Sequence, residues 1–483
     1  MNGRIMEQAS YADWIHTLRV ETYSPLQSLH LHDCFPMPGA LLGQETVYAD
    51  AHGNFSIAVR EKVTLRCGFT LYADEPKYVS LILTSDTVCK VWQEQQENLP
   101  EITPEALDEA IEAAGMYIMN QQLPDGNFKY AYDFISGLED TKDNQVRQAG
   151  VLWSICNLNR DRFTEATRRS ALLGLDFFMR NQRGLPDEGT RIVVTTYKGE
   201  PVIRTGTVAL FCLALIDFIE GQERYLSEAQ KKPFLTALEN NLRFLQFQEL
   251  SSGSWREEYE LGAVRLPDDI APVSPYFDGE SLLAYVKAAS FYRARPELTP
   301  PFPIEERILT AMPLLLKKYT VECFVPEGDD NLTKGFFQWG AMACMAASEL
   351  FHDDDFQILC RDGALSLAWW LIYGHSFETR NGNTGYAIEG LVSSYYLAKK
   401  HGLQEEMKIL RKPIEDTLAR LMTWQVGGPF ESYSPLLTAW KGKIPPRCFG
   451  GITSTADSGY IRIDVVQHQL HAMMLARKHI FNE

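Results

Sequence analysis

Four residues whose side chains can transfer protons stand near the beginning of strongly apolar segments: Glu280, Tyr386, Asp464 and His468. A carboxyl, phenol or imidazole group donates or accepts a proton at neutral pH when burial or a neighbouring charge adjusts its pKa. A charged group at the start of an apolar segment costs free energy unless it is paired or hydrated. Their position indicates a site, and we take these four as its candidate catalytic acids and bases.

Three apolar segments also open with an arginine: Arg147, Arg204 and Arg462. A guanidinium group binds a carboxylate through two parallel hydrogen bonds, so this set favours an anionic substrate such as a uronic acid. The proton at C5 of a uronic acid becomes acidic once the carboxylate is neutralised, and a base can then remove it. We expect His468 to be that base, with its tautomer set by Asp464 on the same helical face. Tyr386 would be the opposite acid.

Glycosidic hydrolysis is an alternative chemistry for the same residues. It requires an acid that protonates the leaving oxygen and a second carboxylate on the opposite side of the scissile bond. Glu280 and Asp464 would face each other across a ring of helical hairpins. Asp143, Asp278 and Glu389 are rivals for either role. The sequence leaves hydrolysis, elimination and C5 epimerisation open.

Aromatic and polar residues around the same segment starts are further candidates for substrate binding. Tyr and Trp rings stack on sugar rings, while carboxylate and amide groups bind sugar hydroxyls. Besides the three arginines, the set comprises Tyr132, Asp143, Trp255, Tyr276, Gln338, Trp339 and Glu389, with Glu327, Asp329 and Arg380 in adjoining loops. A purely structural explanation is also open, in which Asp143 pairs with Arg147. Arg462 would then pair with Asp464 or Glu389.

The elements that would position these groups alternate between two kinds of helix. Amphipathic segments with helical spacing cover residues 104–120, 164–180, 233–247, 305–319, 356–373 and 409–424. Nearly all-apolar segments, rich in Ala, Gly, Ser and Cys, cover residues 144–158, 204–218, 279–292, 335–351, 384–398 and 460–476. Small residues let helices packed on all sides approach closely, so we expect the second set inside and the first outside.

Six outer and six inner helices predict a mainly α fold, an (α/α)6 toroid of six helical hairpins. An open solenoid would need distinct capping repeats, whereas the last segment here is as apolar as the others. In a closed ring all inner helices begin at one end. We therefore expect seven residues to converge there: Arg147, Arg204, Glu280, Tyr386, Arg462, Asp464 and His468.

The twelve-helix pattern resembles the six-hairpin toroid superfamily of glycoside hydrolases, polysaccharide lyases and sugar epimerases. Within it, the run PYFDGESLLAYVKAASFY (275–292) is similar to the Gly-Glu or Gly-Gln helix start in the toroid of uronyl C5-epimerases. The resemblance implies a carbohydrate-active enzyme that acts on a glycan or a uronic-acid-containing saccharide in the bowl of the toroid. Its reaction would be hydrolysis, elimination or C5 epimerisation by acid–base chemistry.

Other functions of helical toroids fit the sequence less well. The run from Gln248 to Trp255 resembles turns of terpenoid cyclases and protein prenyltransferases, but the DxDD and DDxxD motifs of the cyclases are missing, and HDDDF (352–356) is typical of a solvated turn. A lanthionine-synthetase-type toroid needs two Cys and one His around zinc, and no cysteine stands beside a suitable histidine. The main alternative to an enzyme is a non-catalytic toroid that binds a glycan or protein partner in a biosynthetic complex.

Residues 1–100 predict a small β-rich N-terminal domain in front of the toroid domain, residues 101–483. The runs GNFSIAV, KVTLRCGFTLYA and YVSLILT alternate in polarity and contain β-branched residues, as in a small antiparallel sheet. His30 and His32 alternate on one strand face and could supply two zinc ligands. An exposed strand face explains them better, so no metal site is predicted.

The amino-acid composition restricts the classes of molecule that the protein is expected to bind. The formal net charge of −17 argues against nucleic acid or an anionic membrane surface, although a local arginine cluster can still bind an anionic substrate. We expect no signal peptide, and no apolar run reaches the roughly 20 residues of a membrane span. Nine cysteines without a CxxC pair fit buried thiols in a reducing compartment. We expect a cytoplasmic, saccharide-binding protein without a cofactor, with any homo-oligomer or protein-partner contact through the N-terminal domain.

Overall fold

The computed structural model describes residues 99–482, except residues 141, 185–190, 194, 198–199, 262–264, 321–329, 376 and 378–381, together with the backbone of four strands before residue 99. Those strands form two antiparallel hairpins, β1 (Thr46–Ala49) with β2 (Phe55–Ala58) and β3 (Gly68–Tyr72) with β4 (Tyr78–Ile82). The antiparallel pairing predicted for this region is therefore present. His30 and His32 lie outside the described residues, and the division of the chain at residue 100 stays a prediction.

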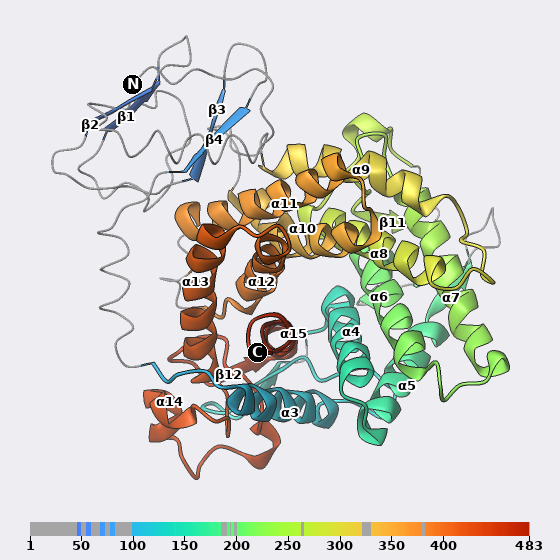
Figure 1. Ribbon diagram of the computed structural model, residues 1–483. Coiled ribbons are helices and arrows are strands. Elements are labelled where there is room, and N and C mark those ends of the chain that lie inside the picture. The colour runs from blue at the N-terminus through green and yellow to red at the C-terminus, as the bar shows by residue number, and fades with distance from the viewer. Residues whose placement is uncertain are drawn as a thin grey trace.

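From residue 104 onward the chain forms six helical hairpins (Figure 1). The outer helices are α3 (Pro104–Asn120), α5 (Glu165–Arg180), α7 (Glu228–Gln248), α9 (Ile304–Thr320), α11 (Asp354–Trp369) and α13 (Gln404–Met422). The inner helices are α4 (Gln145–Asp161), α6 (Thr205–Gln222), α8 (Pro275–Arg293), α10 (Asp330–Leu350), α12 (Gly385–Lys400) and α15 (Ile463–His479). Each inner helix contacts the next, and α15 contacts α4, which closes the ring. The mainly α (α/α)6 toroid predicted from the sequence is confirmed.

The burial of the two helix sets follows from their sequences. In α3 the buried residues Leu107, Ile111, Ala114 and Ile118 recur at intervals of three and four, so one stripe of the helix faces the ring. In α6, by contrast, every residue from Thr205 to Ile219 is buried. A helix that is apolar on all sides is stable in water only when other helices surround it, and this requirement places α6 inside the ring.

Two inner helices begin where a short antiparallel strand ends. Arg204 is the last residue of β10 and the N-cap of α6, and Arg462 is the last residue of β12 and the N-cap of α15. Both arginines were expected inside the helices, but strand pairing keeps their backbones extended. The sheets have the orders β9 (Thr195–Tyr197), β10 (Glu200–Arg204), β11 (Glu258–Glu260) and β6 (Leu138–Asp140), β5 (Ala131–Asp133), β12 (Tyr460–Arg462).

The remaining elements are short. They are β7 (Gln182–Gly184), β8 (Arg191–Val193), α14 (Pro435–Ala439), the π-helical turn Trp370–Gly374 after α11, and 3-10 turns at Asp268–Ile270, Glu431–Tyr433 and Pro446–Cys448. Helix α7 begins earlier than predicted, at Glu228, because Ser227 and Gln230 form a capping box. Pro233 therefore lies within the helix rather than at its start.

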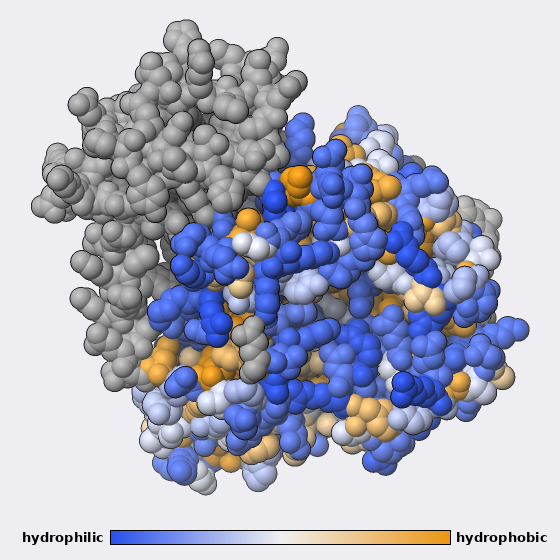
Figure 2. All heavy atoms as spheres, in the orientation of Figure 1, coloured by the Kyte–Doolittle hydropathy of each residue, from blue (hydrophilic) through white to orange (hydrophobic). Residues whose placement is uncertain are grey.

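Among the described helices, α6 alone has the length and apolar composition of a membrane span, and 89% of its apolar window is buried. A core helix passes the same test, so the place of α6 in the ring accounts for its composition. Figure 2 shows a face covered largely by hydrophilic side chains, with apolar ones scattered among them. The cysteines of the described region are free and buried, as expected of structural thiols: Cys156, Cys212, Cys344, Cys360 and Cys448.

Candidate active site

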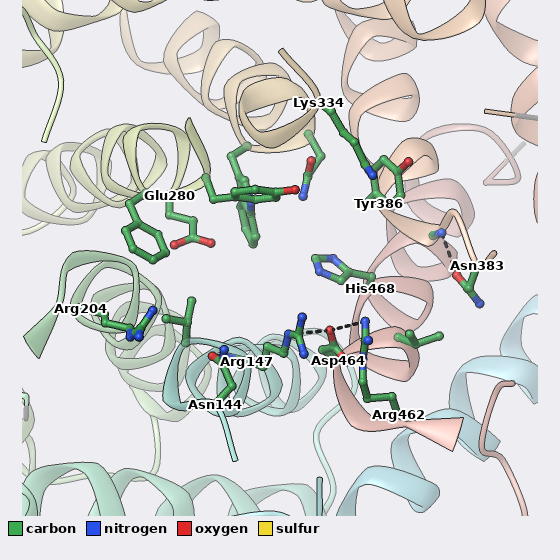
Figure 3. Close-up of a pocket in the computed structure, with 17 residues that line it drawn as sticks. Asn144, Arg147, Arg204, Glu280, Lys334, Asn383, Tyr386, Arg462, Asp464 and His468 are labelled. Atoms are coloured by element: carbon green, nitrogen blue, oxygen red, sulfur yellow. Dashed lines mark hydrogen bonds and ion pairs between the residues drawn. The ribbon is translucent and has the colours of Figure 1, made fainter. Parts of the chain in front are cut away.

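A pocket lies at the end of the ring where the inner helices begin (Figure 3). Its volume is about 500 Å³, within the ~300–1,000 Å³ typical of small-molecule sites. All seven residues expected to converge line it, together with three predicted binding residues, Tyr276, Gln338 and Trp339. Figure 3 shows the seven converging residues around the same cavity, on different inner helices and on the strand ends that lead into two of them. The toroid therefore brings together residues that are far apart in the sequence, while their individual roles stay predictions.

Four predicted binding residues lie outside this pocket: Trp255, Tyr132, Asp143 and Glu389. The Trp255 side chain is fully buried and packs edge-on against Tyr285, with 5.2 Å between ring centroids. Tyr132 on β5 is covered by the guanidinium of Arg447, 3.7 Å from its ring centroid. Asp143 accepts hydrogen bonds from amide side chains at 2.7–3.1 Å, including that of Gln148, instead of pairing with Arg147. The side chains of Trp255, Tyr132 and Asp143 support loops and helix starts rather than the cavity.

Other early candidates are also accounted for. Asp278 accepts hydrogen bonds from the Trp255 backbone N–H at 2.8 Å and the Tyr319 hydroxyl at 2.7 Å, so it fastens a loop to α8. Glu327, Asp329 and Arg380 lie outside the described residues.

Glu389 lies behind His468 and does not line the pocket. Its carboxylate accepts two hydrogen bonds, from Nδ1 of His468 and Nδ1 of His471, each at 2.9 Å. The tautomer of His468 is therefore set by Glu389 on α12 and not, as expected, by Asp464 on its own helix. With Nδ1 occupied, Nε2 is the nitrogen that His468 can use toward the pocket.

The Glu389 carboxylate shifts the pKa of His468 against the effect of burial. Burial alone would lower the pKa of His468, but the Glu389 carboxylate, with a smaller contribution from Asp464, raises it above the usual 6.5. Burial alone would likewise raise the pKa of Glu389, and the two imidazoles outweigh that effect and hold it below the usual 4.5. Glu389 is thus an anion that strengthens His468 as a base.

Asp464 is bound between two arginines. Arg462 donates two hydrogen bonds to it, from Nε to Oδ1 at 2.5 Å and from Nη2 to Oδ2 at 3.0 Å. Nε of Arg147 forms an ion pair with the same Oδ2 atom at 3.1 Å. Arg147 also donates to the Tyr130 hydroxyl. Both carboxylate oxygens are therefore occupied, which leaves Asp464 to orient the arginines. The alternative expectation that Arg462 pairs with Asp464 is confirmed, and the pairing of Arg147 with Asp143 is wrong.

Glu280 has the opposite environment. It is 3% exposed, and its Oε2 atom has no hydrogen-bond partner in the described part of the chain. Burial raises the pKa of Glu280 well above its usual 4.5, so the side chain holds a proton at pH values where an exposed glutamate is ionised. Gly206 at the start of α6 makes room for it, since a Cβ at that position would overlap the Glu280 carboxyl and the Phe277 ring.

Two further polar atoms at the pocket are buried without a hydrogen-bond partner among the described residues, Oε1 of Gln338 and Nε1 of Trp339. The Trp339 ring packs against both Trp153 and His468, with centroid distances of 5.8 and 6.0 Å. A buried polar atom without a partner costs free energy, so such atoms are expected to bond a ligand or water. Together with Glu280 Oε2 they fit a ligand rich in hydroxyl groups.

Sequence reasoning missed two residues of this region. Lys334 lies in the second turn of α10, because that helix begins before the predicted residue 335, and its Nζ is 5.7 Å from the Tyr386 ring centroid. His471 shares Glu389 with His468. Its spacing of three residues from His468 in HQLH was the available signal, since such residues share a helix face.

No protein-family model and no curated protein matches the chain. Solved structures do: the cellobiose 2-epimerase from Spirochaeta thermophila DSM 6192 is similar with a TM-score of 0.52 at 13% identity, covering 82% of this chain and 99% of that one. A D-mannose isomerase is similar with a TM-score of 0.50 at 12% identity, covering 77% and 97%. The chain has the six-hairpin (α/α)6 toroid fold. The resemblance to that superfamily is confirmed at the level of the fold.

Proposed function

We propose that this protein is a carbohydrate-active enzyme that removes a proton from a carbon atom of a sugar. The observation that carries the proposal is the pairing of two environments at one pocket: His468 is made basic by Glu389, and Glu280 is kept protonated by burial. Figure 3 shows the two side chains facing the same cavity from α15 and α8. Both environments raise a pKa, so neutral His468 is a stronger base and the carboxyl group of Glu280 keeps its proton, as expected of a base and an acid.

The reaction follows from these roles. Nε2 of His468 takes the proton from a carbon next to a carbonyl or carboxylate group, and the electrons of the C–H bond move onto that oxygen. Arg147 and Arg462, held by Asp464, supply positive charge for the resulting oxyanion. Glu280 then donates its proton, to the opposite face of the same carbon in an epimerisation or to the departing oxygen in an elimination.

Hydrolysis is less well supported by this geometry. It requires a second carboxyl group that acts as base or nucleophile beside the acid. Glu280 could be the acid, but both oxygens of Asp464 are bound to arginines, and Glu389 lies behind His468. Among the described residues that line the pocket, no other carboxyl group remains.

The names of the similar structures agree with proton transfer. A cellobiose 2-epimerase and a D-mannose isomerase are enzymes that rearrange a sugar without cleaving a glycosidic bond. The shared fold supports a ring-end pocket for a saccharide in this chain, and the His468 and Glu280 environments support the class of reaction.

The test is incubation with neutral and acidic mono- and oligosaccharides in deuterated water, followed by proton NMR and mass spectrometry. We expect deuterium on a sugar carbon without cleavage for an epimerase or isomerase, or an unsaturated product for an elimination. Cleavage with uptake of water would contradict the proposal in favour of hydrolysis. Binding of a saccharide without any exchange would favour the non-catalytic toroid.

Replacing Glu389 with glutamine is expected to change the pH profile. Wild-type kcat/KM should rise as the pH increases through the raised pKa of His468, because only neutral His468 is a base. Without the Glu389 carboxylate, burial dominates and the pKa of His468 falls. The acidic limb of the kcat/KM profile should therefore move to lower pH by roughly one unit or more. The maximal rate should also fall, since the imidazole loses its orientation. An unchanged acidic limb, measured over the full pH range, would contradict the assignment of His468.

Replacing Gly206 with alanine is expected to displace Glu280. The added Cβ would overlap the Glu280 carboxyl, and a misplacement of about 1 Å can lower the rate by about 100-fold. Gly382→Ala is the matched control, because its Cβ meets no described atom within 4 Å. Steady-state rates and melting temperatures of both variants check this, and full activity of a folded Gly206→Ala variant would show that the position of Glu280 is unimportant.

A further inference from the structure

We infer that the sugar bound in this pocket carries an anionic group, a carboxylate or a phosphate, and that Arg204 binds it. The inference rests on the proposed function and names the substrate class of the same site. Its basis is the balance of charge in the pocket and the position of Arg204 within it.

Cationic side chains outnumber ionised carboxylates at the pocket. Arg147, Arg204, Lys334 and Arg462 line it, against Glu280 and Asp464. Asp464 is shared by two of the arginines, Arg147 and Arg462, so one carboxylate balances two guanidinium groups. Glu389 does not line the pocket, and its carboxylate is hydrogen-bonded to His468 and His471. Counted over the residues that the structure describes, the pocket lining is thus positive, in a chain whose formal net charge is −17.

Glu280 does not correct this imbalance. Its environment contributes burial and no cation that would favour the ionised form, so the side chain stays neutral at pH values where an exposed glutamate is ionised. The burial that keeps Glu280 protonated therefore has two consequences: it makes Glu280 the acid of the proposed reaction, and it leaves the positive charge of the pocket uncompensated. A neutral sugar would leave the excess positive charge unbalanced, whereas an anionic sugar would balance it.

Arg204 differs from Arg147 and Arg462, which are both paired with Asp464. Among the described residues none forms an ion pair with it within 4 Å, although its charge lowers the pKa of Glu257, which burial raises overall. The residue is half-buried, and its backbone is fixed between β10 and α6. In Figure 3 its side chain reaches the cavity on the same side as Glu280. A half-buried guanidinium group that faces a cavity from a fixed backbone position is suited to bidentate binding of a carboxylate or phosphate.

The experiment measures binding apart from turnover. Calorimetry with the His468→Gln variant, which binds without turnover, would compare neutral hexoses with the corresponding uronates and hexose phosphates. The same ligands would then be measured with the double variants that also carry Arg204→Gln or Arg204→Lys. We expect one of the two anionic series to bind more tightly than the neutral series. Arg204→Gln should weaken that binding by about 10- to 100-fold. Arg204→Lys should weaken it less, because lysine keeps the positive charge but cannot form the two parallel hydrogen bonds of a guanidinium group. Arg243→Gln, on the outside of α7, should leave binding unchanged.

The outcomes separate this inference from the proposed function. Tighter binding of uronates than of phosphates identifies a carboxylate substrate, and the reverse identifies a phosphate substrate. Equal binding of neutral and anionic sugars, or an equal effect of Arg204→Gln on both, overturns the inference while deuterium exchange can still establish proton transfer. Selective, Arg204-dependent binding of an anionic sugar without exchange by the wild-type protein supports the inference and overturns the proposed function.

Discussion

Replacing His468 with glutamine is expected to lower kcat by about 10²- to 10⁴-fold, the contribution typical of a general base. Glutamine can keep a polar contact with Glu389 but cannot take up a proton, so the KM should change much less than kcat. Deuterium exchange into the substrate should be lost together with product formation, since both depend on removal of the same proton. Steady-state kinetics and NMR exchange rates on the same protein sample would measure the two effects.

His471→Gln provides the matched control for this variant. His471 bonds the same Glu389 carboxylate but does not line the pocket. Its replacement removes one imidazole from the pair and should reduce the rate far less than His468→Gln. Equal losses in the two variants would show that the histidines act together by supporting the structure, and His468 would not be the base.

Replacing Glu280 with glutamine is expected to lower the rate of product formation by about 10²- to 10³-fold and, at the same time, to stabilise the folded protein. The loss of rate follows from the loss of the acid. The gain in stability follows from burial, which raises the pKa of Glu280 well above its usual 4.5. Activity and stability should therefore change in opposite directions, as is common where a catalytic group is held in an unfavourable environment.

The sign of the stability change depends on pH. Between its unfolded pKa near 4.5 and its raised folded pKa, Glu280 binds a proton more tightly in the folded state, so stability falls as the pH rises. Each unit of pKa difference corresponds to about 1.4 kcal/mol. Glutamine does not titrate, so at pH 7 Glu280→Gln should melt a few degrees above wild type, and the difference should shrink near pH 4. A variant that melts below wild type at pH 7 would contradict the burial of an uncompensated carboxyl group.

The ring itself could be predicted from the sequence because its cause is local. An amphipathic helix such as α3 and an apolar helix such as α6 differ in periodicity within about 15 residues, and their alternation leaves few ways to bury the apolar set. The convergence of the pocket residues then followed from topology. Helix boundaries were less certain, since capping residues such as Ser227 set them.

The partners within the site could not be predicted in the same way. Asp464 stands four residues from His468 on one helix, so it was the natural choice of partner, yet His468 bonds Glu389 on a different inner helix. Such a choice depends on how neighbouring helices are rotated, which periodicity does not specify. Trp255 shows the same limit, because a loop residue can point into a pocket or, as here, beneath the loop.

The central claim is that His468 removes a proton from the sugar and Glu280 supplies one. It is tested most directly by following deuterium entry into both substrate and product by NMR for wild type, His468→Gln and Glu280→Gln, with an anionic sugar that the wild-type protein converts. The account predicts that Glu280→Gln still exchanges the substrate proton while forming little product, and that His468→Gln does neither. Exchange at the wild-type rate in His468→Gln would contradict the account.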